Sequence, residues 1–411
     1  MVFNGRPFTA LAVAVILLAF AGTAFASTAQ QAGARSIVVF QKGFVDQDQK
    51  DSIIKKAGMK KIKNLNIINA VVVEREGGAS ALTEGLNGVL RMENDAVIHL
   101  QGKLKGHPQK ESDEVLPWGV DRIDANDVWD RNHDLDVDGQ RWAGSGVKVA
   151  LLDTGVEMNH PDLRKNIKKG YNVVDPKKPP YDALGHGTHV AGTLAAVDNR
   201  AGVLGTAPKA LIYPVKVMDD EGYGTVSGVI EALEWCIENR MQVVNMSFGT
   251  YEDVQSLHDA IAEAYDSGIV LVAAVGNDGP GNDTVEYPAR YTEVIAVSAT
   301  DSTDTVTEWS SSGPEVEIAA PGADILSTFL DGEYIAGYGT SMAAPHVSGT
   351  AALIISSGIK DKNKDGRINS EVREALRESA TDLGDPGRDS LYGHGLLNAK
   401  GAVGRPGHNE R

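Results

Sequence analysis

Cysteine is almost absent from this chain: Cys236 is the only one in 411 residues. A single cysteine excludes an internal disulfide, so a large core or bound metal ions must stabilise the fold. Cys236 falls inside a helical pattern over residues 226–239, with no electropositive setting that the sequence reveals. It is therefore expected to be a small core residue rather than a catalytic thiol.

Basic residues are also scarce relative to acidic ones. Lys and Arg total 39 against 56 Asp and Glu, which gives a formal net charge of −17. So acidic a chain is not expected to bind nucleic acid, and its charge fits a solvated surface or bound cations. The length of 411 residues allows two domains, and a hydrophobic content of 42% suffices for a large core.

Long apolar runs are missing except near the N-terminus. Arg6 precedes an apolar stretch over residues 11–20, and Ala24-Phe25-Ala26 places small residues where a signal peptidase cuts. A membrane anchor is the alternative, but the stretch is short for a bilayer span and ends in small residues. The pattern predicts a signal peptide over residues 1–26 and a secreted, extracellular product without a stable membrane anchor.

Two regions of different pattern follow. Residues 36–102 alternate between strand and helix and predict a small α+β sandwich of the split βαβ kind. We expect strands at 36–40, 65–73 and 97–100 and helices at 47–57 and 79–90. Residues 101–116 are polar and without periodicity, which is typical of an exposed linker open to proteolysis.

From residue 147 the pattern changes to near-continuous apolar strands that alternate with helices. The strands are expected at 147–152, 211–218, 243–246, 269–275 and 294–299, and the helices at 187–197, 226–239, 254–267 and 342–357. This pattern predicts an α/β domain with a doubly wound, mostly parallel sheet covered on both faces. In such sheets the site lies at the carboxyl ends of the strands.

A serine at a glycine-flanked bend, Ser341, precedes the last of these helices. Pro345 is expected in or near the first turn, where its missing N–H does no harm. Serine at this place could simply cap the helix. It is also next to free backbone donors and the positive end of the helix dipole, which suits a nucleophile whose reaction creates an oxyanion.

Other polar residues follow the ends of predicted strands. Asp153 ends the first strand, and Asn277 follows the strand at 269–275. Each could be only a turn residue. His186 stands between two glycines, three residues before His189. That spacing could suit zinc, but the acid of a zinc-protease motif is missing, which favours a general-base histidine.

These residue types can cooperate chemically. Serine is a poor nucleophile unless a histidine accepts its proton, and the histidine needs a buried carboxylate to fix its tautomer. The tetrahedral intermediate needs hydrogen-bond donors, which the N–H of Ser341 and the side chain of Asn277 could supply.

Three motifs together resemble the subtilisin-like serine proteases, the subtilases. They are Asp153-Thr154-Gly155, Gly185-His186-Gly187-Thr188-His189 and Gly339-Thr340-Ser341-Met342-Ala343 with Pro345, in that family's order. The resemblance covers about residues 117–402. It implies a serine endopeptidase in which Asp153 orients His186, His186 is general base and acid, Ser341 is the nucleophile and Asn277 is an oxyanion donor. His189 resembles the family's structural second histidine.

The same resemblance assigns the other segments. It implies a signal peptide (1–26), a propeptide that inhibits the site and assists folding (27–102), a linker with the processing site (103–116), the catalytic domain (117–403) and a polar tail (404–411). Self-cleavage is expected near Gln101, with 101–113 as the full range. The expected partners are polypeptide substrates and the chain's own propeptide, and the enzyme is expected to be a monomer.

One residue bears on substrate preference. Glu286 precedes Tyr287-Pro288, in a segment that resembles the floor of the family's primary specificity pocket. A carboxylate there would favour Lys or Arg before the cut; alternatively it faces solvent or is neutralised by Arg290. The resemblance places further substrate-binding residues at Gly222, Gly224, Ser247, Phe248, Gly249, Ala274 and Gly276.

Structural Ca²⁺ has three candidate sites. The family's strong site maps onto Asp162, Val197, Asn199, Ala201 and Val203, with Glu114 as a further ligand. Two acidic loops have the spacing of calcium loops, one with Asp134, Asp136 and Asp138 and the other with Asp361, Asn363 and Asp365. Each loop could equally be a solvated turn.

Three functions are compatible with these features. The first is a secreted, self-processing serine endopeptidase. The second is a narrow maturation protease that cuts one partner at a basic site, for which Glu286 is the only support. The third is a non-catalytic, calcium-dependent binding protein, against which the intact set of Asp153, His186, Asn277 and Ser341 argues.

Overall fold

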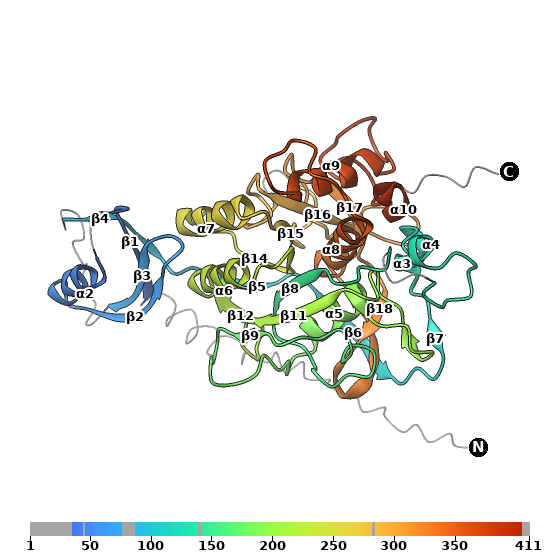
Figure 1. The fold of residues 1–411 in the computed structure, drawn as a ribbon, viewed down its shortest axis with the longest axis horizontal. Helices are drawn as coiled ribbons and strands as arrows, with labels where there is room; N and C mark the ends of the chain where they lie inside the picture. Colours follow the sequence, from blue (N-terminus) through green and yellow to red (C-terminus); the bar gives the residue numbers. More distant parts are fainter. Residues whose placement is uncertain (1–34, 44–45, 76–86, 139–141, 282–283, 405–411) are drawn as a thin grey trace, which may run out of the picture.

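A computed structural model describes residues 35–43, 46–75, 87–138, 142–281 and 284–404 (Figure 1). The expected signal peptide, most of the expected helix at 79–90 and nearly all of the polar tail lie outside the described residues. Within the described ranges, no helix is both long and apolar enough to cross a bilayer.

The N-terminal part is a four-stranded antiparallel sheet, in the order β2-β3-β1-β4, with one helix packed on it. Its elements are β1 Arg35–Phe40, α2 Gln47–Lys56, β2 Met59–Leu65, β3 Ala70–Arg75 and β4 Val89–Asn94. Side chains alternate across the sheet as strand geometry dictates. Val38 and Val71 pack toward Ile54 of α2, whereas Ile37 and Val72 join the core of the larger domain.

Two predictions for this part were wrong in detail. The expected strand at 65–73 is in fact a hairpin, because the chain turns between Leu65 and Ala70 with Asn69 at φ 54°. Val89 and Leu90, expected at the end of a helix, open strand β4, where Val89 pairs with Phe40 of β1. An apolar run alone does not show where a turn interrupts it.

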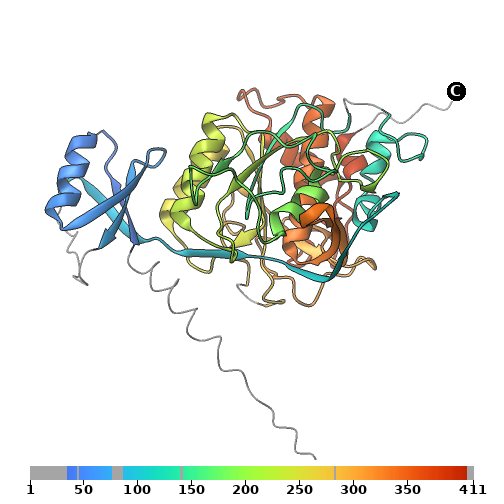
Figure 2. The ribbon, with the colours of Figure 1, turned by 90° about the horizontal axis from the view of Figure 1, so that it is seen from below.

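Much of the segment expected to be an exposed linker is paired β-strand rather than irregular chain. Strand β5 (Val97–Leu100) lies between β12 (Tyr223–Thr225) and β14 (Phe248–Gly249) of the larger domain. The chain then continues as β6 (Lys103–Gln109) and β7 (Glu114–Val115). Strand β6 pairs with β19 (Tyr334–Tyr338), β19 pairs with β18 (Ile325–Thr328), and β7 pairs with β10 (Gly202–Val203). Figure 2 shows this extended path along the larger domain.

The larger domain has a seven-stranded sheet in the order β17-β16-β15-β13-β8-β11-β9, and every ladder in it is parallel. The strands are β8 Lys148–Asp153, β9 Tyr171–Asn172, β11 Leu211–Lys216, β13 Val243–Met246, β15 Val270–Ala274, β16 Val294–Thr300 and β17 Ile318–Pro321. The predicted doubly wound α/β fold is confirmed.

Helices cover both faces of this sheet. One face packs against α5 (His186–Ala195) and α8 (Thr340–Ser357), and the other against α6 (Val226–Glu238) and α7 (Gln255–Asp266). Successive residues of β15 point into the two cores in turn, Val272 into the first and Ala273 into the second. The remaining helical segments are α3 Trp118–Arg122, α4 Asn126–Trp129, η2 Leu330–Gly332, α9 Asn369–Ser379 and α10 Ala399–Val403.

The two parts meet at the N-termini of α6 and α7. The carboxylate of Asp95 accepts hydrogen bonds from the N–H and hydroxyl of Ser227, both at 2.7 Å. The carboxylate of Glu93 accepts from the N–H of Ser256 at 3.1 Å. Acidic groups at helix N-termini satisfy orphan N–H donors and complement the helix dipole, so both contacts favour docking of the small sheet.

Candidate active site

Three of the predicted catalytic side chains start from the ends of core elements. Asp153 is the last residue of β8, His186 the first residue of α5, and Ser341 the second residue of α8. Asn277 lies three residues after β15 ends at Ala274. The parallel sheet therefore presents these groups along its carboxyl edge.

Asp153 and His186 are in direct contact. Nδ1 of His186 donates to Oδ1 of Asp153 at 2.8 Å, and both side chains are buried. The N–H of Thr154 donates to the same oxygen at 2.7 Å and fixes the carboxylate. A Cβ at Gly187 would lie 2.1 Å from the carbonyl oxygen of Gly155, so only glycine allows this approach. The other nitrogen of His186, Nε2, is buried without a hydrogen-bond partner.

Asp182 organises this region, although no sequence motif indicated it. Its fully buried carboxylate accepts from the N–H groups of Leu184 and Gly185 at 3.0 and 2.9 Å. It also accepts from the hydroxyls of Thr154 and Thr188, at 2.9 and 2.7 Å. These bonds tie the start of α5 to the loop that follows β8.

Ser341 lies inside the first turn of α8, so it is not the cap of the helix. The cap is Gly339, with φ 145°. Pro345 has no N–H to donate to the carbonyl of Ser341, the residue four positions earlier. The hydroxyl of Ser247 donates to that carbonyl instead, at 3.0 Å. The hydroxyl of Ser341 donates to the carbonyl of Ser247 at 2.9 Å.

A peptide bond of the chain itself lies against these groups. The N–H of Ser341 donates to the carbonyl oxygen of Gln101 at 2.9 Å. A Cβ on Gly102 would lie 3.0 Å from both Nε2 of His186 and Cβ of Ser341. The Gln101–Gly102 bond therefore lies where the predicted nucleophile, the predicted base and a backbone donor converge.

Asn277 is held by the residue before Ser341. Its side-chain oxygen accepts from the N–H and the hydroxyl of Thr340, at 3.0 and 3.2 Å. Because the oxygen is engaged, the amide NH₂ is the part of the side chain left to donate elsewhere. Thr340 belongs to the motif around Ser341, and these two bonds make it a positioning residue for the Asn277 amide.

The predicted substrate-binding residues surround strand β5. Gly224 pairs with Ile98, Phe248 with Leu100 and Gly249 with His99. The carbonyl of Ser247 accepts from the N–H of Gln101 at 3.3 Å. At Gly222, a Cβ would come within 2.9 Å of the side chain of Leu100. Ala274 and Phe248 also pack in the two hydrophobic cores of the domain.

Glu286 is buried beside the side chain of Gln101. It is 2% exposed, and its Oε1 accepts from Nε2 of Gln101 at 2.7 Å. A Cβ on Gly249 or Gly276 would lie 2.3 or 3.0 Å from its carboxylate oxygens, so two glycines make room for it. Burial raises the pKa of Glu286.

Neither alternative for Glu286 describes this geometry. The side chain is not in solvent, and Nε of Arg290 pairs with Glu315 at 3.2 Å. Oε2 of Glu286 is buried and makes no hydrogen bond, although Nε2 of His99 is 3.4 Å away in an ion-pair contact.

The first candidate calcium set is brought together. The buried carboxylate of Asp162 accepts from the side chain of Asn199 at 2.6 Å and from the N–H of Val203 at 2.9 Å. Oε1 of Glu114 accepts from the N–H of Asn199 at 2.8 Å. These residues fit a cation, since the groups of Asn199, Val203 and Tyr334 that donate to Asp162 are neutral and a flip of the Asn199 amide would add an oxygen ligand.

The two acidic loops give less support for a bound cation. In the first, Asp134 and Asp138 accept backbone N–H bonds from Asp136 and Arg131. In the second, Asp361 accepts from Lys364 and Gly366, while Asp365 accepts from Arg367. Among the described residues, no group of three or more His, Cys, Asp or Glu side chains is arranged to hold a metal ion. The described parts of both loops are bends held by hydrogen bonds from backbone N–H groups to side chains.

His189 and Cys236 are core residues. Nε2 of His189 lies 3.0 and 3.1 Å from the carbonyl oxygens of Ile325 and Ile335, and burial lowers its pKa to about 3. A neutral imidazole between two carbonyls is a structural link, not a zinc ligand. Cys236 is buried in the core around α6, and burial raises the pKa of its thiol.

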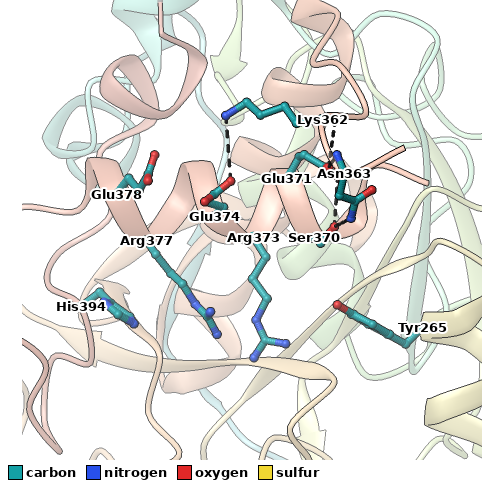
Figure 3. A pocket seen from close by; sticks show the side chains of 10 residues that line it. All are labelled: Tyr265, Lys362, Asn363, Ser370, Glu371, Arg373, Glu374, Arg377, Glu378 and His394. Atoms are coloured by element: carbon teal, nitrogen blue, oxygen red, sulfur yellow. Dashed lines mark hydrogen bonds and ion pairs between the residues drawn. The ribbon is translucent and has the colours of Figure 1, made fainter. Parts of the chain in front are cut away.

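A separate cavity of about 560 Å³ lies against α9 (Figure 3). None of its described lining residues belongs to the candidate active site. The cationic groups have carboxylate partners: Lys362 lies 3.9 Å from Glu374, and Arg373 and Arg377 both bind Glu317. The cavity is therefore not a ready anion site.

Comparison with known proteins agrees with this geometry. Residues 144–395 match the sequence profile of the Subtilase family. The chain is 37% identical to subtilisin E of Bacillus subtilis over 391 residues, which are 92% of this chain and 94% of that protein. It is 42% identical to subtilisin Savinase of Lederbergia lenta over 288 residues, 70% and 98% of the two chains. A thermostable alkaline protease of Halalkalibacterium halodurans is 41% identical over 286 residues, 70% and 73% of the two.

Proposed function

Because this chain belongs to the subtilase family of serine peptidases, we propose that it is a secreted endopeptidase that works through an acyl-enzyme on Ser341. In this proposal Asp153 orients His186, and His186 takes and returns the proton. The observation that carries it is the position of the Gln101–Gly102 peptide bond. The carbonyl oxygen of Gln101 accepts a hydrogen bond from the N–H of Ser341, and Gly102 lies against Nε2 of His186.

The proposed reaction uses these groups in sequence. Rotation of the Ser341 side chain releases its hydroxyl from Ser247, and the oxygen attacks the substrate carbonyl while His186 takes its proton. The N–H of Ser341 and the side-chain amide of Asn277 stabilise the oxyanion. His186 then protonates the leaving amine, and a water molecule hydrolyses the ester by the reverse steps.

We further propose that the chain cuts itself between Gln101 and Gly102. Strand β5 lies as a substrate would, paired on both sides, and its register supports this bond within the range 101–113. Residues 27–101 would then act as an inhibitor, docked through Asp95 and Glu93. We expect the mature enzyme to be a monomer.

One experiment tests processing and catalysis together. The wild-type chain and Ser341→Ala are expressed in parallel, and their N-termini are sequenced. We expect Gly102 first in the wild type and an uncut variant. A different first residue would contradict the assigned bond, and normal processing of the variant would contradict self-cleavage. Failure of a fluorophosphonate probe to label Ser341 would favour the non-catalytic binding protein.

Glu286 supports a preference for Lys or Arg before the cut. Gln101 engages only Oε1 of the carboxylate, so a cationic side chain with more donors could satisfy Oε2 as well. Peptides that differ only in Arg, Lys, Gln, Phe or Leu at this position measure the preference. Turnover after Phe or Leu equal to turnover after Arg would reject it. Backbone pairing along β12 and β14 supports breadth at the other positions.

Structural Ca²⁺ completes the proposal. Asp162, Asn199, Glu114 and the carbonyls of Val197, Ala201 and Val203 would hold the ion. When bound, it would tie β7 to the loop that ends in β10.

A further inference from the structure

The carboxylate of Glu286 contacts two residues of the segment that lies in the site. Its Oε1 accepts from Gln101 at 2.7 Å, and its Oε2 lies 3.4 Å from Nε2 of His99. Residues 99 and 101 are two positions apart on an extended strand, so their side chains point to the same face. The last residue before the cut and the third residue before it thus share one buried carboxylate.

The surroundings of His99 are acidic and aromatic. Its ring lies 5.4 Å from the ring of Tyr251, whose hydroxyl donates to Asp278 at 2.9 Å. Glu286 and Asp278 both raise the pKa of His99, the contact with Glu286 most strongly. Nε2 of Gln101 also lies 3.1 Å from Nε2 of His99. Two carboxylates and an aromatic ring form a place for a cation.

The hydrogen-bond count of Glu286 points the same way. Gln101 occupies one oxygen, and the other is buried without a hydrogen bond. A buried acceptor without a donor is costly, so a group that donates to it gains affinity. Among the described residues, His99 makes the one ion pair to that oxygen.

We infer that the carboxylate of Glu286 binds the side chains at two substrate positions at once. The enzyme would then prefer a cationic side chain or a histidine at the third residue before the cut. This inference rests on the proposed peptidase function and adds a second specificity position to it. The preferred substrates are extended peptides that carry hydrogen-bond donors or positive charge at alternate positions.

The test uses processed wild-type enzyme and peptides built on residues 97–104. The position of His99 is varied to His, Lys, Phe, Ala or Glu, with everything else constant, and kcat/KM is measured at pH 6. We expect His and Lys to exceed Ala by about three- to tenfold and Glu to fall below Ala, as suits an ion pair between a buried carboxylate and a partly exposed cation. Glu286→Gln should remove this ranking. Glu293→Gln, a carboxylate paired with His258 at 3.2 Å, should keep it.

Several outcomes would overturn the inference. Equal kcat/KM for Ala, Lys and His would reject a second position, and Phe equal to His would assign the preference to stacking on Tyr251. If Glu286→Gln does not mature, the wild-type panel still decides, and His99→Glu in the full chain should slow the first cut. Normal cutting of that variant would count against the inference. Failure to cut any peptide, with Ser341 unreactive, would reject the peptidase function as well.

Discussion

The N–H of Ser341 donates to the carbonyl oxygen of Gln101 at 2.9 Å. This contact joins two residues that are 240 positions apart, and it gives the carbonyl carbon its place in the site. An oxyanion formed on Gln101 would keep this bond and strengthen it, because charged acceptors bind N–H groups more tightly than neutral ones.

Removal of the side-chain oxyanion donor should slow turnover. For Asn277→Ala we expect kcat to fall by roughly 10²–10³, a magnitude known from a subtilisin, with little change in KM. Thr340→Val should lower kcat less, about tenfold, because it only loosens the Asn277 amide. Thr303→Val, in an exposed turn, is the matched control. Steady-state kinetics distinguish the variants, and a purely structural role for Asn277 would predict no loss at constant stability.

The triad substitutions should form an unequal series. Ser341→Ala and His186→Ala are each expected to lower kcat by about 2 × 10⁶-fold, and Asp153→Ala by about 3 × 10⁴-fold, as measured in a subtilisin. The double variant of His186 and Ser341 should be no worse than either single one, because the two act as a unit. Additive losses, measured with purified precursor cut by an added protease, would contradict joint action.

Release of the inhibitory segment should depend on pH. Glu286 raises the pKa of His99 in the complex. A raised pKa contributes binding that is complete below the free value of about 6.5 and is lost as pH rises through the bound value. Activity recovered after dilution of the processed complex should therefore rise about three- to tenfold between pH 6 and pH 8.

His99→Ala is the matched variant for this prediction. It should flatten the pH dependence and release more active enzyme at pH 6. Asp278 also raises the pKa of His99, so Asp278→Asn should reduce the slope partly. A wild-type complex that dissociates equally at both pH values would contradict the prediction.

Chelation should lower thermal stability. We expect the melting midpoint, measured by calorimetry, to fall when Ca²⁺ is removed, because binding to the native state alone stabilises it. Asp162→Asn should abolish most of this response, whereas Asp361→Asn should leave it. A midpoint that is insensitive to the chelator would reject stabilising calcium altogether.

The charge network beneath α9 should matter for stability. Glu317 is 2% exposed, and its pKa is lowered by Arg373 and Arg377. For Arg373→Met we expect a loss of about 3 kcal/mol in the free energy of unfolding, because a buried charge loses a main partner. A lowered carboxylate pKa contributes stability above the unfolded value that is lost as pH falls through the folded value. The difference from wild type should therefore shrink in acid.

The control for this network is Arg367→Met. Arg367 pairs with Asp266 at the surface, at 3.0 Å. Urea unfolding at pH 7 should show a large change for Arg373→Met and little for Arg367→Met. Equal losses of unfolding free energy would show that the buried ion pair stabilises the fold no more than the surface pair does.

Sequence reasoning succeeded where each signal is local. The buried strands before Asp153 and Asn277 have continuous apolar runs, and the glycines around His186 reflect a close backbone approach. Sequence patterns did not reveal the residues whose partners lie far along the chain. Strand β6 has no apolar alternation in its sequence, and it is ordered by backbone pairing with β19, which sequence patterns do not reveal. Asp182 belongs to no motif, and the partner of Glu286, Gln101, is 185 positions away.

The path from Gln101 to Glu114 also has a kinetic consequence. As long as the chain is continuous, the segment in the site is present at a fixed effective concentration that no dilution can lower. Cleavage would turn the same contacts into a bimolecular equilibrium. Uncut molecules would then stay inhibited at any dilution, whereas cut molecules would become active when dilution lets the cleaved segment dissociate. Whether dilution can activate the enzyme would thus depend on cleavage of the single peptide bond after Gln101.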